Sequence, residues 1–174
     1  MKYLVKLFVV TLLVFVCTHA TAEQKVAFLD MKFILNNSKA GKGAQDYLKK
    51  KFKDNQKKFS DQEIQLKKEE NDLLQEKSSL TKEEYQKKAT ALRKKVVTYQ
   101  SQRRTSLEKI AKQRTEAKAK LLKELDPILT TFLSENNISL IVDKKNVVKG
   151  NTELDITKQI VEKLNKELPS INLK

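Results

Sequence analysis

The sequence predicts a mostly α, α+β fold in which a long antiparallel helical hairpin, an arm resembling a coiled coil, projects from a small body containing strands. Three observations support this prediction. The 83 residues from Ala44 to Asp126 contain no Gly or Pro and are rich in helix-favouring Lys, Glu, Gln, Leu and Ala. Apolar residues in that run recur at heptad spacing. Both ends of the chain carry short apolar runs typical of strands.

Residues 1–22 are predicted to be a signal peptide. Lys2 and Lys6 precede an apolar run that extends from Leu7 to Cys17. Ala20-Thr21-Ala22 then supplies small residues at the spacing of a cleavage site. The run of 11 residues is shorter than the roughly 20 that a spanning helix needs. An uncleaved anchor is therefore the less favoured alternative. Lipid attachment at Cys17 is disfavoured because the preceding Val16 is larger than the small residue that a lipoprotein signal normally carries there.

Cleavage after Ala22 would remove Cys17 and His19, the only Cys and His of the chain. The remaining chain has no thiol nucleophile, no imidazole base and no Cys/His metal site. It also lacks the disulfides that staple small secreted domains. We therefore expect no enzyme activity and no cofactor, and a stability that comes from packing or assembly.

The first part of the body is expected at residues 23–40. Val26 to Leu29 is predicted to be a strand, with Asp30 capping a short helix through Ile34 and Leu35. Ser38 to Gly43 contains a Gly-Lys pair, but Gly43 replaces the hydroxyl residue that a phosphate loop needs. This segment is instead predicted to be the turn into the arm.

The arm is expected at residues 41–120. A single straight helix over the Gly- and Pro-free run would be about 125 Å long, so a break is more plausible. Thr81 and Glu84 form a capping-box pattern after Ser78 and Ser79, which are poor helix formers. We predict the tip of a hairpin near residues 78–81.

Each of the two helices of this hairpin has its own apolar spacing. The outbound helix has apolar residues seven apart and polar residues at the companion positions, which predicts a seam that is only half apolar. The apolar set is Phe52, Phe59, Leu66, Leu73 and Leu80, and the polar set is Asn55, Gln62, Glu69 and Glu76. The return helix follows an alternating four-three spacing that Arg103 and Arg114 interrupt, through Tyr85, Ala89, Leu92, Val96, Tyr99, Leu107, Ile110, Ala117 and Leu121.

The second part of the body is expected at residues 121–174. A wide apolar face from Leu121 to Leu133 should enter a core, and Pro127 should bend the backbone, either as a kink or as a new helix start capped by Asp126. Asn136 and Asn137 are expected to end this helix.

Two more strands and a final helix are predicted beyond that point. The strands are Ile138 to Val142 and Val147-Val148, with a turn at Gly150-Asn151. Asp155 should cap a helix that ends at Pro169, with an apolar face of Ile156, Ile160, Val161, Leu164 and Leu168.

A body of about 70 residues buries too little surface to be comfortably stable alone. Its apolar strands would also invite aggregation if their edges stayed open. We therefore expect oligomerisation through the strands. The candidate oligomerisation residues are Val26, Phe28, Leu140, Ile141, Val142 and Val147.

The positive charge is concentrated on one half of the arm. Ala44 to Glu84 carries ten basic and ten acidic residues, whereas Tyr85 to Lys123 carries 13 basic residues against Glu108 and Glu116, a net of +11. Such an excess either is a solvated surface or meets an anionic partner. The candidate binding residues are Arg93, Lys94, Lys95, Arg103, Arg104, Lys109 and Lys112.

Three partners match this charge: nucleic acid, an anionic membrane or lipopolysaccharide surface, and an acidic protein client. Nucleic acid is disfavoured by the signal peptide and by the lack of a recognition motif. The glutamate pairs Glu69-Glu70 and Glu83-Glu84 stand beside lysines on exposed helix positions and are interpreted as surface charge. A binding or assembly role is therefore favoured.

The order of strand, long hairpin, strands and end helix resembles the Skp family, also called OmpH, of periplasmic chaperones for outer-membrane proteins. One stretch that carries the resemblance is Lys25 to Met31, which is similar to the family's opening strand. The other is Ile138 to Val161, with Leu140-Ile141-Val142-Asp143, Val147-Val148 and Asp155-Ile156-Thr157. The arms match in character rather than residue by residue.

The resemblance implies a homotrimer with a small barrel body, from which three hairpins surround a cavity that holds unfolded outer-membrane proteins without ATP. It also implies a periplasmic location and a lipopolysaccharide site on the arms, whose position does not transfer to this sequence. Two alternatives stay open: a coiled-coil protein that tethers or spaces the envelope, and a cationic protein that binds lipopolysaccharide.

Overall fold

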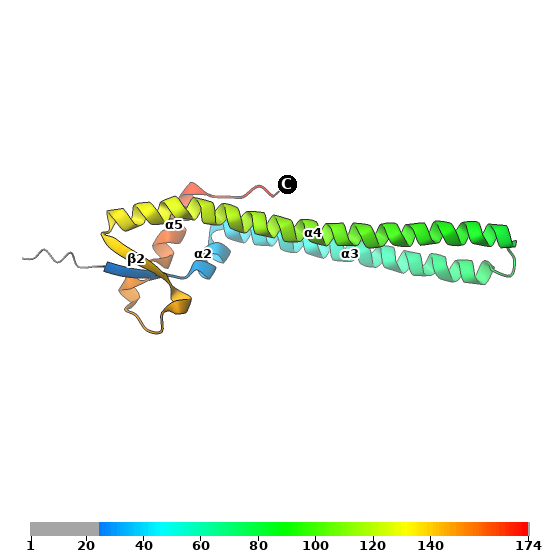
Figure 1. Ribbon diagram of the computed structural model, residues 1–174, viewed down its shortest axis with the longest axis horizontal. Helices are drawn as coiled ribbons and strands as arrows, with labels where there is room; N and C mark the ends of the chain where they lie inside the picture. The colour runs from blue at the N-terminus through cyan, green and yellow to red at the C-terminus, as the bar shows by residue number, and fades with distance from the viewer. Residues whose placement is uncertain (1–24, 174) are drawn as a thin grey trace, which may run out of the picture.

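The computed structural model describes residues 25–173, so the predicted signal peptide lies outside the described residues. The chain forms a small body at one end and a two-helix arm that extends far beyond it (Figure 1). The arm consists of α3, Lys39–Glu76, and α4, Lys82–Glu135. The mainly helical fold with a long hairpin is thus the one that the sequence predicts.

The arm has the predicted tip. Helix α3 ends at Glu76, and α4 begins after Thr81, whose hydroxyl accepts a hydrogen bond from the backbone N–H of Glu84. The Glu84 carboxylate in turn accepts from the backbone N–H of Thr81 at 2.9 Å, which completes the capping box. The 38 residues of α3 correspond to a length of about 57 Å at 1.5 Å per residue.

The body holds a two-stranded parallel sheet formed by β1, Lys25–Leu29, and β2, Ile138–Asp143. Val26 pairs with Leu140 and Phe28 with Val142. The short helix α2, Met31–Asn37, follows β1, and its N-cap is Asp30, as predicted. The last helix, α5, Thr157–Glu167, packs against α2 and against the end of α4.

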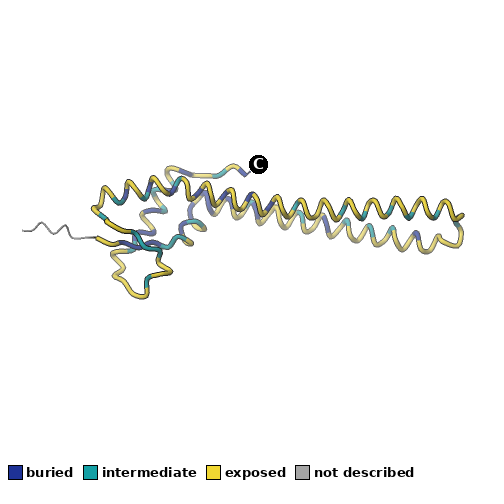
Figure 2. The backbone as a smooth tube through the Cα atoms, viewed as in Figure 1, coloured by how far each residue is buried: buried dark blue, intermediate teal, exposed yellow. Residues whose placement is uncertain are grey.

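One face of the sheet and three helices enclose the main core. The most deeply buried side chains, which include Leu29, Ile34, Leu125, Ile160 and Leu164, come from β1, α2, α4 and α5, whereas β2 contributes only half-buried residues. The burial colours show this contrast, with dark blue in the body and at the root of the arm, and mostly yellow and teal toward the tip (Figure 2). Burial of apolar area therefore stabilises the body far more than the upper arm, by which we mean the part of the hairpin between Leu48 and Ile110.

The predicted strand at Val147-Val148 is wrong. The chain forms a 3₁₀ turn, Lys144–Asn146, and a second one, Thr152–Leu154, and the sheet of the described residues has only β1 and β2. The Asp143 carboxylate accepts a hydrogen bond from the backbone N–H of Lys145, which turns the chain as soon as β2 ends. Val148 is fully exposed, so no neighbouring strand holds it.

Of the two alternatives predicted at Pro127, the new helix start is wrong, because α4 runs unbroken from Lys82 through Pro127 to Glu135. Proline removes one backbone hydrogen bond from a helix. Leu125, Ile128 and Phe132 are buried on both sides of Pro127, and their packing offsets this loss. The helix ends as predicted, because Asn137 adopts the left-handed conformation with φ of 53°.

The turn into the arm is shorter than Ser38 to Gly43. Ser38 is buried and caps α3, and residues 39–43 already belong to the helix. A Cβ on residue 41 would lie 2.0 Å from the carbonyl oxygen of Leu35, whereas residue 43 has open space around it. Gly41 therefore permits the close approach of α3 to the end of α2.

The chain end was not predicted to reach the arm. After α5, residues 168–173 leave the body and run back along α4 (Figure 1). Leu173 lies in a second buried cluster at the root of the arm with Ala44, Leu48, Ile110 and Ala117.

Candidate functional site

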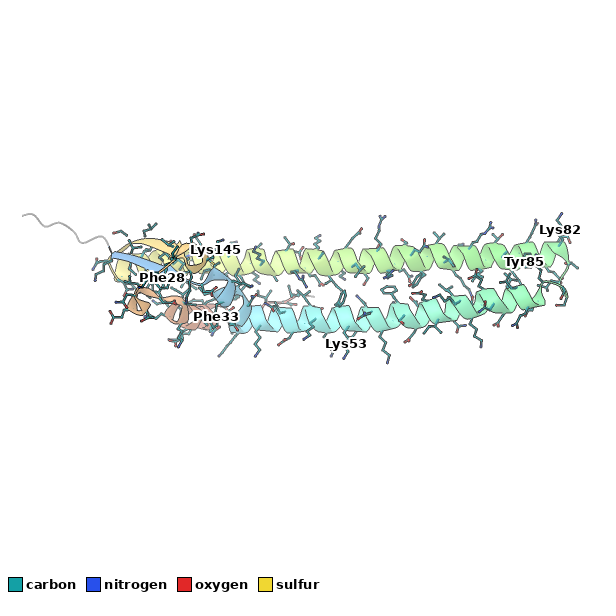
Figure 3. All side chains as sticks on the ribbon, turned by 90° about the horizontal axis from the view of Figure 1, so that it is seen from below. Phe28, Phe33, Lys53, Lys82, Tyr85 and Lys145 are labelled. Carbon is teal, nitrogen blue, oxygen red and sulfur yellow. The ribbon has the colours of Figure 1, made fainter. Side chains whose placement is uncertain are left out.

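The two arm helices meet along a seam that is only partly apolar, and Figure 3 shows side chains of both helices between the two ribbons. We define the seam as the buried and half-buried positions between Leu48 and Leu73 on α3 and between Tyr85 and Ala117 on α4. On α3 these are Leu48, Asn55, Phe59, Gln62, Leu66, Glu69 and Leu73, and on α4 they are Tyr85, Ala89, Leu92, Val96, Tyr99, Ser106, Ile110, Gln113 and Ala117. This confirms that the polar companions Asn55, Gln62 and Glu69 face the partner helix.

Apolar and polar layers therefore alternate along the seam. The rings of Phe59 and Tyr99 meet edge to face with centroids 6.0 Å apart, a geometry that adds roughly 0.5–1.5 kcal/mol. Asn55 donates a hydrogen bond to the Ser106 hydroxyl in the neighbouring layer. The Oε1 of Gln62 is buried without a hydrogen-bond partner among the described residues, which costs stability.

Exposed ion pairs join the helices beyond these layers. Lys95 Nζ lies 2.7 Å from a Glu69 carboxylate oxygen, and Lys88 pairs with Glu76. The hydrogen bond from Lys95 lowers the pKa of Glu69 despite some burial. Pairs of this exposure contribute about 0–1 kcal/mol and weaken with salt. The upper arm is thus held together by weak contacts.

The predicted return seam differs from the observed one at two layers. Leu107 and Arg114 lie outside the seam. The four-three spacing from Tyr99 places Ser106 and Gln113 against α3 in their stead. Leu107 is 44% exposed, and Phe52 of the outbound seam is 48% exposed. The prediction followed apolar residues wherever they occur. The observed seam instead keeps a regular spacing and has polar residues at these two layers.

One flank of the seam contains a groove of about 550 Å³ midway along the arm. Most of its lining residues are polar, but the surface that they turn toward the groove is mainly apolar; the lining residues are Gln62, Gln65, Leu66, Ala91, Lys94, Lys95, Thr98, Tyr99 and Gln102. Several of these residues directly precede a seam residue, as Gln65 precedes Leu66 and Lys95 precedes Val96.

The opposite flank carries exposed apolar side chains. Residues that directly follow a seam residue point to the side opposite those that precede it, since successive helix residues are about 100° apart. Leu74 and Val97 follow seam residues in this way, as does Leu107, and Phe52 lies 22 residues before Leu74, which places it about 40° from Leu74 around the helix, on the same side. We call Phe52, Leu74, Val97 and Leu107 the apolar flank; these four side chains are between 44% and 64% exposed.

The seven predicted basic residues do not form one patch. Arg93 and Arg104 lie at spacings of four and three from Val97 and Leu107, so they share the apolar flank. Lys94 and Lys95 line the groove on the other flank. Arg103 follows the four-three spacing between Tyr99 and Ser106, but it is exposed and so does not belong to the seam.

Some of these cations are already paired. Besides Lys95, Arg104 pairs with Glu108 at 3.2 Å and Lys112 with Glu116 at 3.8 Å. Within residues 25–173, no carboxylate forms an ion pair with any of the other four, which are Arg93, Lys94, Arg103 and Lys109. Four of the seven predicted binding residues therefore remain available to an anionic partner.

The predicted oligomerisation residues separate onto the two faces of the sheet. Ile141 packs against the main core. On the outer face, Val26 is 44% exposed and its pairing partner Leu140 is 54% exposed. Phe28 on the same face is buried, since Lys144 lies 5.8 Å above its ring and the segment with Val147 and Gly150 covers it. Val142 is half-buried.

Asp155 joins the last helix to this part of the body. Its carboxylate accepts hydrogen bonds from the backbone N–H and the hydroxyl of Thr157, and it pairs with Lys144 at 2.7 Å. Burial raises the pKa of Asp155, but the hydrogen bonds from Lys144 and Thr157 outweigh burial and hold this pKa below its ordinary value. The predicted N-cap is therefore wrong by one residue: α5 begins at Thr157 and its N-cap is Ile156, and Asp155 contacts Thr157 from the position before the N-cap.

No helix within residues 25–173 is long and apolar enough to cross a bilayer. The same residues hold no group of three or more His, Cys, Asp and Glu placed to bind a metal ion. The features that are present, a long arm with a weakly packed seam and an exposed apolar flank, define a binding protein with an elongated surface.

Comparison with known proteins agrees with this class. The family profile described as outer membrane protein (OmpH-like) matches residues 25–164. The chain therefore belongs to the Skp/OmpH family, whose members are non-enzymatic chaperones. A search of curated proteins finds no match.

A crystal structure from Caulobacter crescentus CB15 has a similar fold. It is of an OmpH-like protein assigned as an outer membrane chaperone, and the two chains superpose with a TM-score of 0.79 at 19% identity. The alignment covers 89% of this chain and 92% of that one. At this identity the match shows the fold alone.

Proposed function

We propose that this protein is an ATP-independent periplasmic holdase that binds unfolded outer-membrane proteins and prevents their aggregation. The observation that carries the proposal is the apolar flank on an otherwise highly charged arm. Its four side chains do not form one contiguous patch, because Phe52 and Leu74 alone are about 33 Å apart along α3. They instead offer a row of apolar contacts to a chain that extends along the arm. Unfolded barrel proteins expose apolar side chains before they reach the membrane.

The basic residues beside the flank support the same function. Arg93 and Arg104 border Val97 and Leu107, so the stems of these arginines extend the apolar surface while their charges stay in water. Such a surface attracts many sequences without fixing one register, as a holdase requires. The weak seam allows the two arm helices to separate and to fit clients of different size.

The active form that we propose is a homotrimer assembled through the sheets. The exposed pair Val26 and Leu140 on the outer sheet face supports this assembly, together with the unpaired outer edge of β2. Three arms around one axis would place their apolar flanks around a shared cavity.

The direct test mixes the purified mature protein with a porin diluted from urea and follows light scattering. An equimolar ratio of trimer to porin should suppress aggregation. The variant Val97→Ser/Leu107→Ser should lose most of this suppression, because it removes apolar surface from the flank. Ile64→Ser is the matched control, since Ile64 is 65% exposed on the far side of α3 from the seam. Equal protection by all three proteins would reject the flank as the client surface.

A second candidate function is binding to lipopolysaccharide or another anionic surface. The unpaired cations Arg93, Lys94, Arg103 and Lys109 favour it. Binding that falls steeply between low and physiological salt, whether or not the client is unfolded, would support this function. An envelope tether without a client instead requires arm helices that exchange amide hydrogens as slowly as the body.

A further inference from the structure

The segment that follows α5 packs against the root of the arm. We call residues 169–173 the strap and the buried residues beneath it the root groove, which comprises Ala44, Leu48, Ile110, Gln113 and Ala117. Leu173 is 8% exposed there, and Ile171 packs against both this cluster and the main core. The strap belongs to no helix or strand.

The root groove holds the strap partly through its backbone. Gln113 is 7% exposed, and its Nε2 donates a hydrogen bond to the carbonyl oxygen of Leu173. Every residue type offers that carbonyl, so this bond does not select a particular side chain. Ala44 and Ala117 are small, and the space that they leave beside the helices accommodates a large apolar side chain of the strap.

The strap has a recognisable pattern of side chains. Apolar and polar residues alternate in Ile171-Asn172-Leu173-Lys174. In an extended chain every second side chain points to the same face, and Ile171 and Leu173 are the two that pack on the arm. The same alternation characterises the strands of membrane β-barrels, with one face apolar and the other polar.

We propose that the root groove is a binding site for extended polypeptide segments with alternating apolar side chains, and that the strap occupies it until such a segment displaces it. The choice of client strands as the ligand rests on the proposed function; the groove and its exchange with the strap do not. A tethered strap has a high effective concentration at its own groove. Only clients that present several such segments would therefore displace it efficiently.

The test uses the full mature chain and a fluorescently labelled peptide with the sequence of residues 168–174. In the variant Ile171→Asp/Leu173→Asp the strap is released, because a charge cannot enter the apolar groove. Fluorescence anisotropy should show that this variant binds the peptide at least tenfold more tightly than the unmodified protein does. Adding Gln113→Leu to the released variant should weaken binding about fivefold, the equivalent of one hydrogen bond.

Two peptides control for non-specific binding. The labelled peptide with both aspartate substitutions should bind neither protein. A barrel-strand peptide should compete with the strap peptide, whereas a peptide of the same composition with its apolar residues made adjacent should not. Equal affinity of the released and unmodified proteins, or no binding to the released protein, would overturn the proposal.

Folding of the variant is checked by circular dichroism. If the double variant does not fold, Leu173→Asp alone replaces it, and the same differences in peptide affinity decide the outcome. Peptide binding by the released variant without protection of porin would reject the holdase and leave the groove standing. Protection of porin without any peptide binding would reject the groove as a binding site and leave the holdase standing.

Discussion

At the scale of single residues, two glycines of α3 have opposite roles although they are two positions apart. Gly41 lies against the carbonyl oxygen of Leu35, and Gly43 has no neighbour within 4 Å. Gly41→Ala should destabilise the protein by about 1–3 kcal/mol because the backbone must move apart. Gly43→Ala should stabilise it by up to about 1 kcal/mol through helix propensity. Urea denaturation measures both, and equal shifts of the two variants would contradict the close approach at residue 41.

Asp155 predicts a pH dependence of stability. Its pKa is lowered in the folded protein, so its stabilisation is present above the ordinary carboxyl pKa and is lost as the pH falls through the lowered folded value. Asp155→Asn keeps an acceptor for Thr157 but loses the charge that pairs with Lys144. At neutral pH it should cost at most about 1 kcal/mol, because the Lys144 side chain is 51% exposed.

Denaturation of the unmodified protein and of Asp155→Asn should be compared from neutral pH to about pH 2. The difference between the two should disappear at the acidic end. Asp155→Ala provides the contrast, since it also removes the hydrogen bonds to Thr157 and should stay less stable throughout. A difference between the unmodified protein and Asp155→Asn that grows on acidification would contradict the role of this carboxylate.

At the scale of elements, the polar layers of the seam set how firmly the arm is closed. Gln62→Leu replaces a buried carbonyl oxygen that lacks a partner with an apolar side chain next to Leu66. It should stabilise the arm by about 1 kcal/mol and slow amide exchange over residues 52–80. Gln56→Leu, at an exposed position of the same helix, should change neither the stability of the arm nor its amide exchange. Unchanged exchange in Gln62→Leu would show that this layer does not limit opening.

The sequence predicted the arm elements better than the details of the body. The prediction of the arm rests on local signals that are nearly independent of tertiary context. These signals are the lack of Gly and Pro, the heptad spacing and the Thr81 capping box. The strand at Val147-Val148 was predicted from β propensity alone, but strands depend on a partner that the sequence does not reveal. The helix through Pro127 needed knowledge of the packing around Leu125 and Ile128.

The candidate site was only partly accessible to sequence reasoning. The excess of positive charge on α4 was visible, yet its distribution among flank, groove and ion pairs depends on which residues face α3. The apolar flank was missed because Phe52 and Leu107 had been assigned to the seam. Gln113 and the strap were missed because no short-range signal connects them; a regular four-three count from Tyr99 would have placed Gln113 in the seam.

At the scale of the whole molecule, the outer face of the sheet governs the predicted assembly. Leu140→Asp places a charge beside Val26 on the exposed face and should dissociate the oligomer, which sedimentation would detect as a fall to the mass of one chain. Ile64→Asp makes a similar change on the arm, away from the sheet, and should leave the mass unchanged. A Leu140→Asp protein that retains the parent mass would contradict assembly through this face.

The parallel pairing of β1 with β2 has a consequence for how the molecule reaches its native state. Leu29 and Asp143 are register partners, although more than a hundred residues separate them in the chain. The entropic cost of closing so long a loop is reduced if the hairpin forms first, since its contacts are local and bring both ends together. Shortening both helices by matched heptads should therefore leave the body able to fold, whereas cutting the chain at the tip should slow its folding severely.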